Sequence, residues 1–330
     1  MSASRERTIQ RLAVALVVTS AAAGLSMVVL AAFPEFQLRH RVLAMAAAFI
    51  PYGILAWLVV TVILLAAPRR WIKALAVLSV AALALQVSWT RPYWPHDPAA
   101  SAPDFTVMTL NTYYGWASGP QLMTEADRVQ PDLVVLQEYS DTLVASLDTT
   151  DWFARLPYRV GVASPEWKST NSVVFSRYPL TALPAPWDDP GQHIVRVALP
   201  SGPVTLVAAH VSNPTLGVQR WRNELGILQS VTQDHLGEPF LLVGDFNAVR
   251  EHEPMRRLLS IGLTDAAQQS GTGWLPTFPS AHSYPTTQVA LPVIGIDHVL
   301  LGPTLQATSV QSFRVDGTDH RGLVARIGRG

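Results

Sequence analysis

The residues of this chain best suited to chemistry are Gly244-Asp245-Phe246-Asn247, which follow the apolar run 240–243. A short Val/Leu-rich run that stops at a glycine is typical of a buried strand ending in a tight turn. In an extended backbone, Asp245 and Asn247 point to the same side. This places a carboxylate and an amide at the end of a sheet, where polar groups are costly unless they bind something. An Asp/Asn turn without function is the alternative interpretation of this motif alone.

Polar residues of the same kinds stand at the ends of other apolar runs. The additional positions are Asn111, Gln137-Glu138, His210, Asp297 and Asp319-His320. One such residue at a strand end means little, because loops begin there. Six such ends, nearly all carrying Asp, Glu, Asn or His, predict that the strand ends converge on one polar pocket.

The elements that must position these residues are short strands with few helices between them. The predicted helices are Gln121–Val129 and Val218–Asp234, and the predicted strands are Phe105–Leu110, Leu133–Leu136, Ser172–Phe175, Ile194–Leu199, Val204–Ala209, Phe240–Val243, Ile296–Leu301 and Leu323–Ile327. Many strands and few helices favour a layered α/β sandwich, with two sheets packed face to face and helices outside.

The first ninety residues contain three long runs without charge. Leu12–Phe33 has 22 residues, Val42–Ala67 has 26, and Ala74–Thr90 has 17 and can be extended by Trp71 and Ile72. Each run approaches or exceeds the ~20 residues that cross the bilayer core. The sequence therefore predicts a membrane anchor over residues 1–91 with three transmembrane helices, at about 12–33, 42–67 and 71–90.

The placement of Lys and Arg predicts the orientation of the anchor. Three arginines precede the first run and three basic residues lie in the loop near residue 70, against two arginines near residue 40 and Arg91 after the third run. Since basic residues favour the cytoplasmic side, we expect the amino end inside the cell. Three crossings then put a Pro-rich linker, 92–103, and a globular domain, 104–330, outside the cytoplasm.

Composition excludes some classes of site. The chain has 330 residues and no cysteine, which rules out disulfides and thiolate chemistry. Residues 1–100 hold nine of the 24 basic residues but three of the 24 acidic ones, so residues 101–330 hold 15 basic and 21 acidic residues. The second part thus has no basic excess from which to build a nucleic-acid-binding face.

The polar strand ends resemble a known superfamily when they are taken in order. The matching stretches are Thr109-Leu110-Asn111, Gln137-Glu138, Asn171 to Pro179, His210, Gly244 to Asn247, Ile296-Asp297 and Thr318-Asp319-His320. Their order and spacing over residues 104–328 are similar to the endonuclease/exonuclease/phosphatase superfamily. The resemblance implies a DNase I-like, four-layer α/β/β/α sandwich that cleaves phosphate esters with Mg²⁺ or Mn²⁺.

The resemblance also implies which residues bind the cation and activate water. Glu138 matches the principal metal-binding glutamate, Asp319 the second ligand, and Asn111 the residue that supports this shell. Mg²⁺ commonly takes one or two protein carboxylates together with waters and substrate oxygens, so a sparse ligand set is expected. Asp245 matches the residue that orients or deprotonates the attacking water, and Asn247 matches a donor to the phosphoryl oxygens.

The remaining matched positions concern the phosphate and the proton transfers. The resemblance pairs His320 with Asp297, an arrangement that favours imidazolium beside developing negative charge. It implies that His210 is an acid or a phosphate contact. Asn213 and Asn111 match further positions that contact the phosphate.

A fold does not identify a substrate, so the location and the charge of the domain are the features that bear on it. The three predicted helices also give the chain an architecture similar to the VanJ-type membrane proteins, which are linked to lipid-carried cell-wall intermediates. The leading hypothesis is therefore hydrolysis of a lipid-linked phosphate mono- or diester presented by the membrane outside the cytoplasm. A membrane-tethered nuclease and a non-catalytic protein that binds lipid or a partner are the two alternatives.

Overall fold

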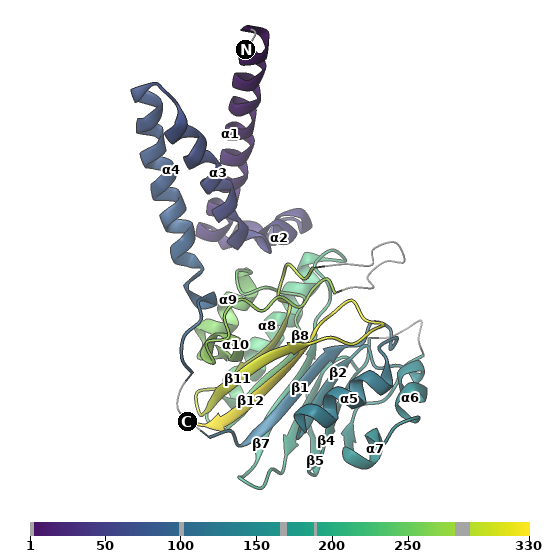
Figure 1. Ribbon diagram of the computed structural model, residues 1–330. Helices are drawn as coiled ribbons and strands as arrows, with labels where there is room; N and C mark the ends of the chain where they lie inside the picture. Colours follow the sequence, from purple (N-terminus) through teal and green to yellow (C-terminus); the bar gives the residue numbers. More distant parts are fainter. Residues whose placement is uncertain (1–2, 99–101, 166–169, 188–189, 281–290) are drawn as a thin grey trace. The chain divides into compact units, whose positions relative to one another are not determined.

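The computed structural model describes residues 3–98, 102–165, 170–187, 190–280 and 291–330 (Figure 1). The chain divides into two compact units. One comprises Met1–Pro92 with Glu251–Glu253, and the other comprises Tyr93–Arg250 with Pro254–Gly330. Of the predicted linker, residues 99–101 lie outside the described part of the chain.

The first unit is helical. Its elements are α1 (Ala3–Ala32), η1 (Pro34–Leu38), α2 (Arg41–Ala47), η2 (Ile50–Tyr52), α3 (Gly53–Ala66) and α4 (Arg70–Trp89). Two stretches, Arg7–Ala32 and Arg70–Trp89, are each long and apolar enough to cross a membrane. These two stretches correspond to the first and third predicted spans.

The continuous helix predicted over 42–67 is interrupted in the structure. The helical segments Arg41–Ala47 and Ile50–Ala66 meet at an angle of 58°, with the short helix η2 at the break. Pro51 lies in this break and has no backbone N–H with which to continue the helical hydrogen bonds. Apolar composition alone did not reveal the bend, because every residue around it is uncharged.

The second unit contains two six-stranded sheets. The first has the order β11-β12-β1-β2-β4-β3 and the second has the order β5-β6-β7-β8-β10-β9. The strands of the first sheet are β1 (Phe105–Asn111), β2 (Leu133–Gln137), β3 (Tyr158–Val160), β4 (Ser172–Ser176), β11 (Leu305–Phe313) and β12 (Gly322–Arg329). Those of the second sheet are β5 (Leu180–Leu183), β6 (His193–Val197), β7 (Val204–His210), β8 (Phe240–Asp245), β9 (Thr264–Asp265) and β10 (Asp297–Leu301).

Helices lie between and beside these strands. They are η3 (Arg91–Tyr93), α5 (Gly119–Val129), α6 (Asp141–Leu147), α7 (Trp152–Arg155), α8 (Val218–His235), α9 (Glu253–Ser260) and α10 (Ala266–Gln269). Figure 1 shows α5, α6 and α7 along the first sheet. The eight predicted strands and the two predicted helices are all present, with ends that differ by a few residues.

The core has separate layers because each strand alternates its side chains between two faces. One cluster joins Val107 and Val135 of the first sheet to Leu206, Leu241 and Val243 of the second, so the two sheets pack face to face. A second cluster lies between the outer face of the first sheet and α5 to α7. The residues of β7 and β8 that point away from the first cluster are also fully buried, as is the apolar stripe of α8. The α/β fold with two sheets packed face to face that the sequence predicts is confirmed by this architecture.

Strand register brings the polar strand ends together. In the first sheet β1 and β2 run parallel, and Asn111 pairs with Gln137, the residue before Glu138. In the second sheet β7 and β8 run parallel with His210 opposite Asp245, while antiparallel β10 places Asp297 opposite Asp245. The polar ends of both sheets therefore lie at the same end of the sandwich.

Candidate active site

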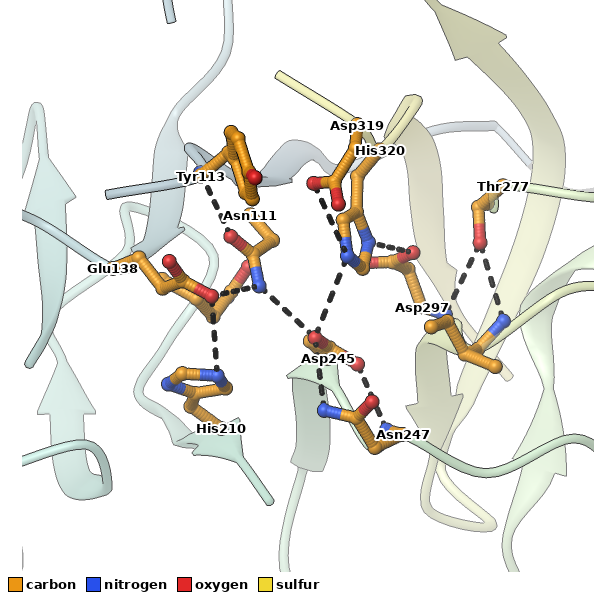
Figure 2. A network of polar contacts seen from close by, with 12 residues as sticks. Asn111, Tyr113, Glu138, His210, Asp245, Asn247, Thr277, Asp297, Asp319 and His320 are labelled. Atoms are coloured by element: carbon orange, nitrogen blue, oxygen red, sulfur yellow. Dashed lines mark hydrogen bonds and ion pairs between the residues drawn. The ribbon is translucent and has the colours of Figure 1, made fainter. Parts of the chain in front are cut away.

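Asn111 joins the two sheets by bridging two carboxylates, as Figure 2 shows. Its Nδ2 donates to Oε1 of Glu138 at 3.1 Å and to Oδ2 of Asp245 at 3.0 Å. Its Oδ1 accepts the backbone N–H of Tyr113 at 3.0 Å, which fixes the orientation of the amide. One side chain thus holds a candidate cation ligand of the first sheet beside a candidate general base of the second.

The backbone around these residues is strained. Among the described residues, five other than glycine have positive φ, and four of them flank the site: Tyr113, Tyr114, Glu138 and Asn247. Such conformations cost of order 1–3 kcal/mol each and persist where the surrounding structure enforces them, often at functional sites. Gly244 has φ 142°, and a Cβ there would collide with the carbonyl oxygen of Ala209. The glycine of the Gly-Asp-Phe-Asn motif is therefore required by the close approach of β7 and β8.

Asp245 is almost fully buried and accepts several hydrogen bonds. The backbone N–H of Asn247 donates to Oδ1 at 2.8 Å, and Nδ2 of Asn247 lies 3.3 Å from Oδ2. The same Nδ2 donates to the carbonyl of Val211 at 2.9 Å. Burial raises the pKa of Asp245 above its ordinary value, although the nearby imidazole of His320 opposes this. A carboxylate with a raised pKa, held by fixed donors, is suited to accept a proton from water.

His320 and Asp297 form a buried pair. Nδ1 of His320 lies 2.9 Å from Oδ2 of Asp297, and the ring of Phe278 packs against the imidazole at 5.1 Å between centroids. Burial lowers the pKa of His320, but the carboxylates of Asp297, Asp245 and Asp319 outweigh it and raise the pKa to about 10. At neutral pH His320 is therefore an imidazolium, and its Nε2 lies 3.9 Å from carboxylate oxygens of both Asp245 and Asp319.

Asp319 and Glu138 fit a divalent cation. Burial raises the pKa of Asp319 to about 6; the charges of Glu138 and Asp245 act in the same direction, and that of His320 opposes them. Oδ1 of Asp319 is buried and accepts no hydrogen bond within the described part of the chain. Two carboxylates that repel each other, one with an unsatisfied oxygen, provide the hard oxygen donors that Mg²⁺ and Mn²⁺ prefer.

A second group of residues also has the spacing of a metal site. One ligand atom each from Asp245, Asp297 and His320 lie within 4.8 Å of one another, and Oδ1 of Asp297 also accepts no hydrogen bond among the described residues. The oxygens of Asp245 in this set already accept hydrogen bonds from Asn111 and Asn247, whereas Oδ1 of Asp319 accepts none within the described part of the chain. We favour Glu138 and Asp319 as ligands for this reason.

The structure places His210 and Asn213 less centrally. Nε2 of His210 lies 3.9 Å from Oε1 of Glu138, while its Nδ1 contacts the carbonyl of Thr170 at 3.2 Å. Asn213 is exposed, and its Oδ1 accepts the N–H of Thr215 at 2.8 Å, which closes a local turn. The structure therefore brings His210 to the edge of the network, and shows Asn213 in a neighbouring loop.

Three positioning residues lie outside the predicted set. Thr318 donates to the carbonyl of Asn111 at 2.7 Å and accepts the N–H of His320. Oγ1 of Thr277 accepts the N–H groups of Ile296 and Asp297. The N–H of Tyr114 donates to Oε2 of Glu138 at 2.7 Å. Thr318 had a signal in the sequence, since it directly precedes Asp319 in the matching stretch Thr318-Asp319-His320, whereas Tyr114 lies three residues after Asn111 and had none.

Comparisons with known proteins agree with this architecture. A sequence model of the endonuclease/exonuclease/phosphatase family matches residues 108–320. No curated protein gives a significant match to the sequence.

Several solved structures are similar to the chain. An endonuclease/exonuclease/phosphatase from Beutenbergia cavernae DSM 12333 has 21% identity and a TM-score of 0.52, over 69% of this chain and 72% of that one. The 3'-5' exonuclease NExo from Neisseria meningitidis has 19% identity and a TM-score of 0.50, over 67% and 98%. D. rerio TDP2 complexed with a single-strand DNA product has 15% identity and a TM-score of 0.53, over 68% and 98%. At these identities the likeness shows the fold.

Proposed function

Because this chain belongs to the endonuclease/exonuclease/phosphatase family, whose members act on phosphate esters, we propose that it is a cation-dependent phosphoesterase. The observation that carries the proposal is the network in which Asn111 bridges Glu138 and Asp245, with the pair His320–Asp297 beside it. This network joins a candidate cation site, a buried carboxylate and a fixed positive charge.

Glu138 and Asp319 would hold Mg²⁺ or Mn²⁺, with Asn111 orienting Glu138. When bound, such a cation neutralises charge on the phosphate oxygens and so favours attack at phosphorus. The chain itself supplies the remaining groups, which must orient water, stabilise the developing charge and move two protons.

Asp245 accepts the proton of the attacking water, with Asn111 and Asn247 holding its carboxylate in place. The water oxygen forms a bond to phosphorus as the bond from phosphorus to the ester oxygen breaks. The imidazolium of His320, kept charged by Asp297, stabilises the negative charge that develops on the phosphoryl oxygens. His210 gives a proton to the departing ester oxygen, and Asn213 contacts the phosphate. Asn247, predicted as a phosphate contact, positions Asp245 instead, because its Nδ2 already donates to Val211 and Asp245.

The proposed substrate is a lipid-linked phosphate mono- or diester outside the cytoplasm. Two apolar helices long enough to span a membrane support a membrane-bound substrate, and we assign the bent pair Arg41–Ala47 and Ile50–Ala66 as a third span. Three crossings with the amino end inside place residues 104–330 on the outer side, as the distribution of basic residues favours. We propose in addition a VanJ-type architecture for the chain, which these three spans would give it.

Turnover by the full-length chain in detergent micelles with Mg²⁺ or Mn²⁺ tests the proposal. The substrates are a polyprenyl phosphate, a generic aryl phosphodiester and plasmid DNA. We expect hydrolysis of the polyprenyl phosphate, and loss of it in Glu138→Gln, which keeps the shape of the side chain and removes its charge. Glu125→Gln is the matched control, since Glu125 pairs with Arg128 on α5. Equal turnover by wild type and Glu138→Gln would contradict the cation assignment.

A membrane-tethered nuclease is the second candidate. It is favoured by the similar structures, since NExo is an exonuclease and TDP2 was solved with a DNA product. A nuclease would cleave plasmid DNA with a rate that falls steeply with salt, because phosphate contacts release counterions. Turnover of plasmid alone among the three substrates would establish this alternative and reject the lipid substrate.

A further inference from the structure

Large apolar side chains are exposed on loops around the candidate active site. Nine such residues are exposed in the described part of the second unit, and five of them lie on four of these loops: Tyr114, Trp116, Val162, Leu216 and Leu291. Leu216 is 85% exposed and Leu291 is 73% exposed. Isolated exposed apolar residues are ordinary, but their concentration around one site indicates an interaction surface.

One of these loops is hydrogen-bonded to the candidate cation site. The backbone N–H of Tyr114 donates to Glu138, as described above, and places Trp116 two residues away. The ring of Trp116 meets that of Tyr114 at 5.8 Å between centroids and that of Tyr113 at 5.2 Å. Because Tyr113, Tyr114 and Gly115 all have left-handed backbone conformations, this aromatic cluster is held in one tight turn beside Glu138.

The other loops are tied to residues on the remaining sides of the site. Nδ2 of Asn171 donates to the carbonyl of Val162 at 2.9 Å, and the neighbouring Thr170 contacts His210. Leu216 lies in the loop that begins at Val211, whose carbonyl accepts Nδ2 of Asn247. Leu291 lies two residues before Val293, whose N–H donates to the carbonyl of Phe278, the residue packed on His320.

Within the part of the chain that the structure describes, the segments of these loops at 112–118, 161–165, 211–217 and 291–295 contain only apolar, small and neutral polar residues. The loop between β3 and β4 continues through Glu166 and Lys168, which lie outside the described residues. Nucleic acid binds through Lys and Arg that neutralise its phosphates, and the four described segments offer none beside the five apolar residues. Three of the five exposed residues are aliphatic and have no ring on which a base could stack.

We propose that Tyr114, Trp116, Val162, Leu216 and Leu291 form an apolar rim that contacts the hydrocarbon chain esterified to the substrate phosphate. The inference rests on the proposed phosphoesterase function and adds the residues that select a lipid. The charged centre binds the phosphate while the rim removes the first part of the hydrocarbon chain from water. Contact with the rim therefore makes a long-chain ester a better substrate than a short one with the same phosphate.

Chain-length selectivity measures the contribution of the rim. The full-length chain in detergent micelles with Mg²⁺ is assayed on hexadecyl phosphate and on butyl phosphate, and the ratio of their kcat/KM values is compared among variants. We expect the ratio to fall about tenfold in Trp116→Ser, and about tenfold further in Trp116→Ser/Leu216→Ser. Each substitution removes one apolar side chain that contacts the hydrocarbon chain, and the lost burial free energy corresponds to about a tenfold change. Ile227→Ser is the matched control, because Ile227 is exposed on α8 outside the four loops, and it keeps the wild-type ratio.

The possible results distinguish failure of the apolar rim from failure of the phosphoesterase function. A wild-type ratio in the double variant would overturn the rim while leaving the phosphoesterase in place. Absence of turnover of any phosphate ester by the wild type would overturn both. Cleavage of a single-stranded oligonucleotide that falls in the rim variants as much as hexadecyl phosphate does would also overturn the rim as a lipid site, since it would show base stacking instead.

Discussion

At the scale of single residues, Asn111 determines the distance between the carboxylates of Glu138 and Asp245. Both carboxylates accept from the same amide nitrogen. Without that donor, the two negatively charged groups repel each other, and no shared hydrogen-bond donor holds them at a fixed separation. The proposed chemistry needs one of them as a cation ligand and the other as a base, so their separation matters to both tasks.

Asn111→Ala is expected to reduce kcat/KM about 10- to 100-fold, the range found for groups that orient metal ligands. The measurement is steady-state hydrolysis together with Mn²⁺ affinity by titration. Asn223→Ala, on the exposed face of α8, is the control and keeps wild-type values. A variant at Asn111 with wild-type Mn²⁺ affinity and rate would show that the bridge has no role.

Asp319 gives the site a pH dependence that the cation should shift. Its pKa is raised to about 6 by burial, with the charges of Glu138 and Asp245 adding to the effect. Below that pH the group is protonated and cannot ligate, so activity at low Mg²⁺ falls as the pH decreases through about 6. High Mg²⁺ competes with the proton and moves the midpoint to lower pH. Rate profiles at two Mg²⁺ concentrations with the same midpoint would contradict the role of Asp319.

At the scale of elements, a buried ion pair joins β10 to β9 close to the site. Nδ1 of His298 lies 2.7 Å from Oδ2 of Asp265, and its Nε2 lies 2.9 Å from the carbonyl of Ala248. Burial opposes both charges, but the pair lowers the pKa of Asp265 and raises that of His298. The pair therefore supports the strand that carries Asp297 and the segment that follows Asn247.

We expect His298→Leu to lower the free energy of unfolding by roughly 3 kcal/mol, because it leaves the charge of Asp265 buried without a partner. His235→Leu, which removes a more exposed pair with Glu238, should cost about 1 kcal/mol or less. The measurement is thermal unfolding of each variant in detergent, followed by tryptophan fluorescence. Equal losses in the two variants would contradict the difference between buried and exposed pairs.

The stabilisation by the buried pair of Asp265 and His298 also depends on pH. The lowered pKa of Asp265 gives stability that is present above about pH 4 and is lost as pH falls through its folded value. The raised pKa of His298 gives stability that is full below about pH 6.5 and is lost as pH rises through its folded value. The difference between wild type and His298→Leu should therefore be largest near pH 5 and shrink in alkaline solution.

The sequence predicted the central strands well and the edge strands poorly. Strands β1, β2, β7 and β8 are nearly continuous apolar runs, because both of their faces are covered. In β11 a bulge between Ala307 and Ser309 breaks the alternation, and β3 and β5 are short and largely exposed. None of these three strands shows the pattern of apolar residues that is typical of a buried strand. The bend at Pro51 was missed for a related reason, since hydropathy does not report backbone geometry.

The candidate site was predictable where it depends on strand ends, and not where it depends on turns. Asn111, Glu138, Asp245, Asp297 and His320 converge as the order of strands implies. The left-handed turn at Tyr113 and Tyr114, and the bond from Tyr114 to Glu138, follow from contacts made only in the folded unit. The roles assigned to these residues stay predictions until the variants are measured.

At the scale of the whole molecule, the proposed topology can be tested because the chain contains no cysteine. A single cysteine at Ser201, in an exposed turn of the second unit, should react with a membrane-impermeant maleimide in intact cells. A single cysteine at Ser4 should react only after the membrane is opened. Labelling of both positions in intact cells, or of both only after the membrane is opened, would place them on the same side and mean two crossings, with Arg41–Ala66 not spanning the membrane.

The bond from Asn111 to Asp245 has a consequence for how function is acquired during folding. Its donor belongs to one sheet and its acceptor to the other, so it closes only after the two have come together. Neither sheet alone therefore holds both of the carboxylates that Asn111 bridges. On the proposed function, hydrolysis requires that the two sheets have packed against each other.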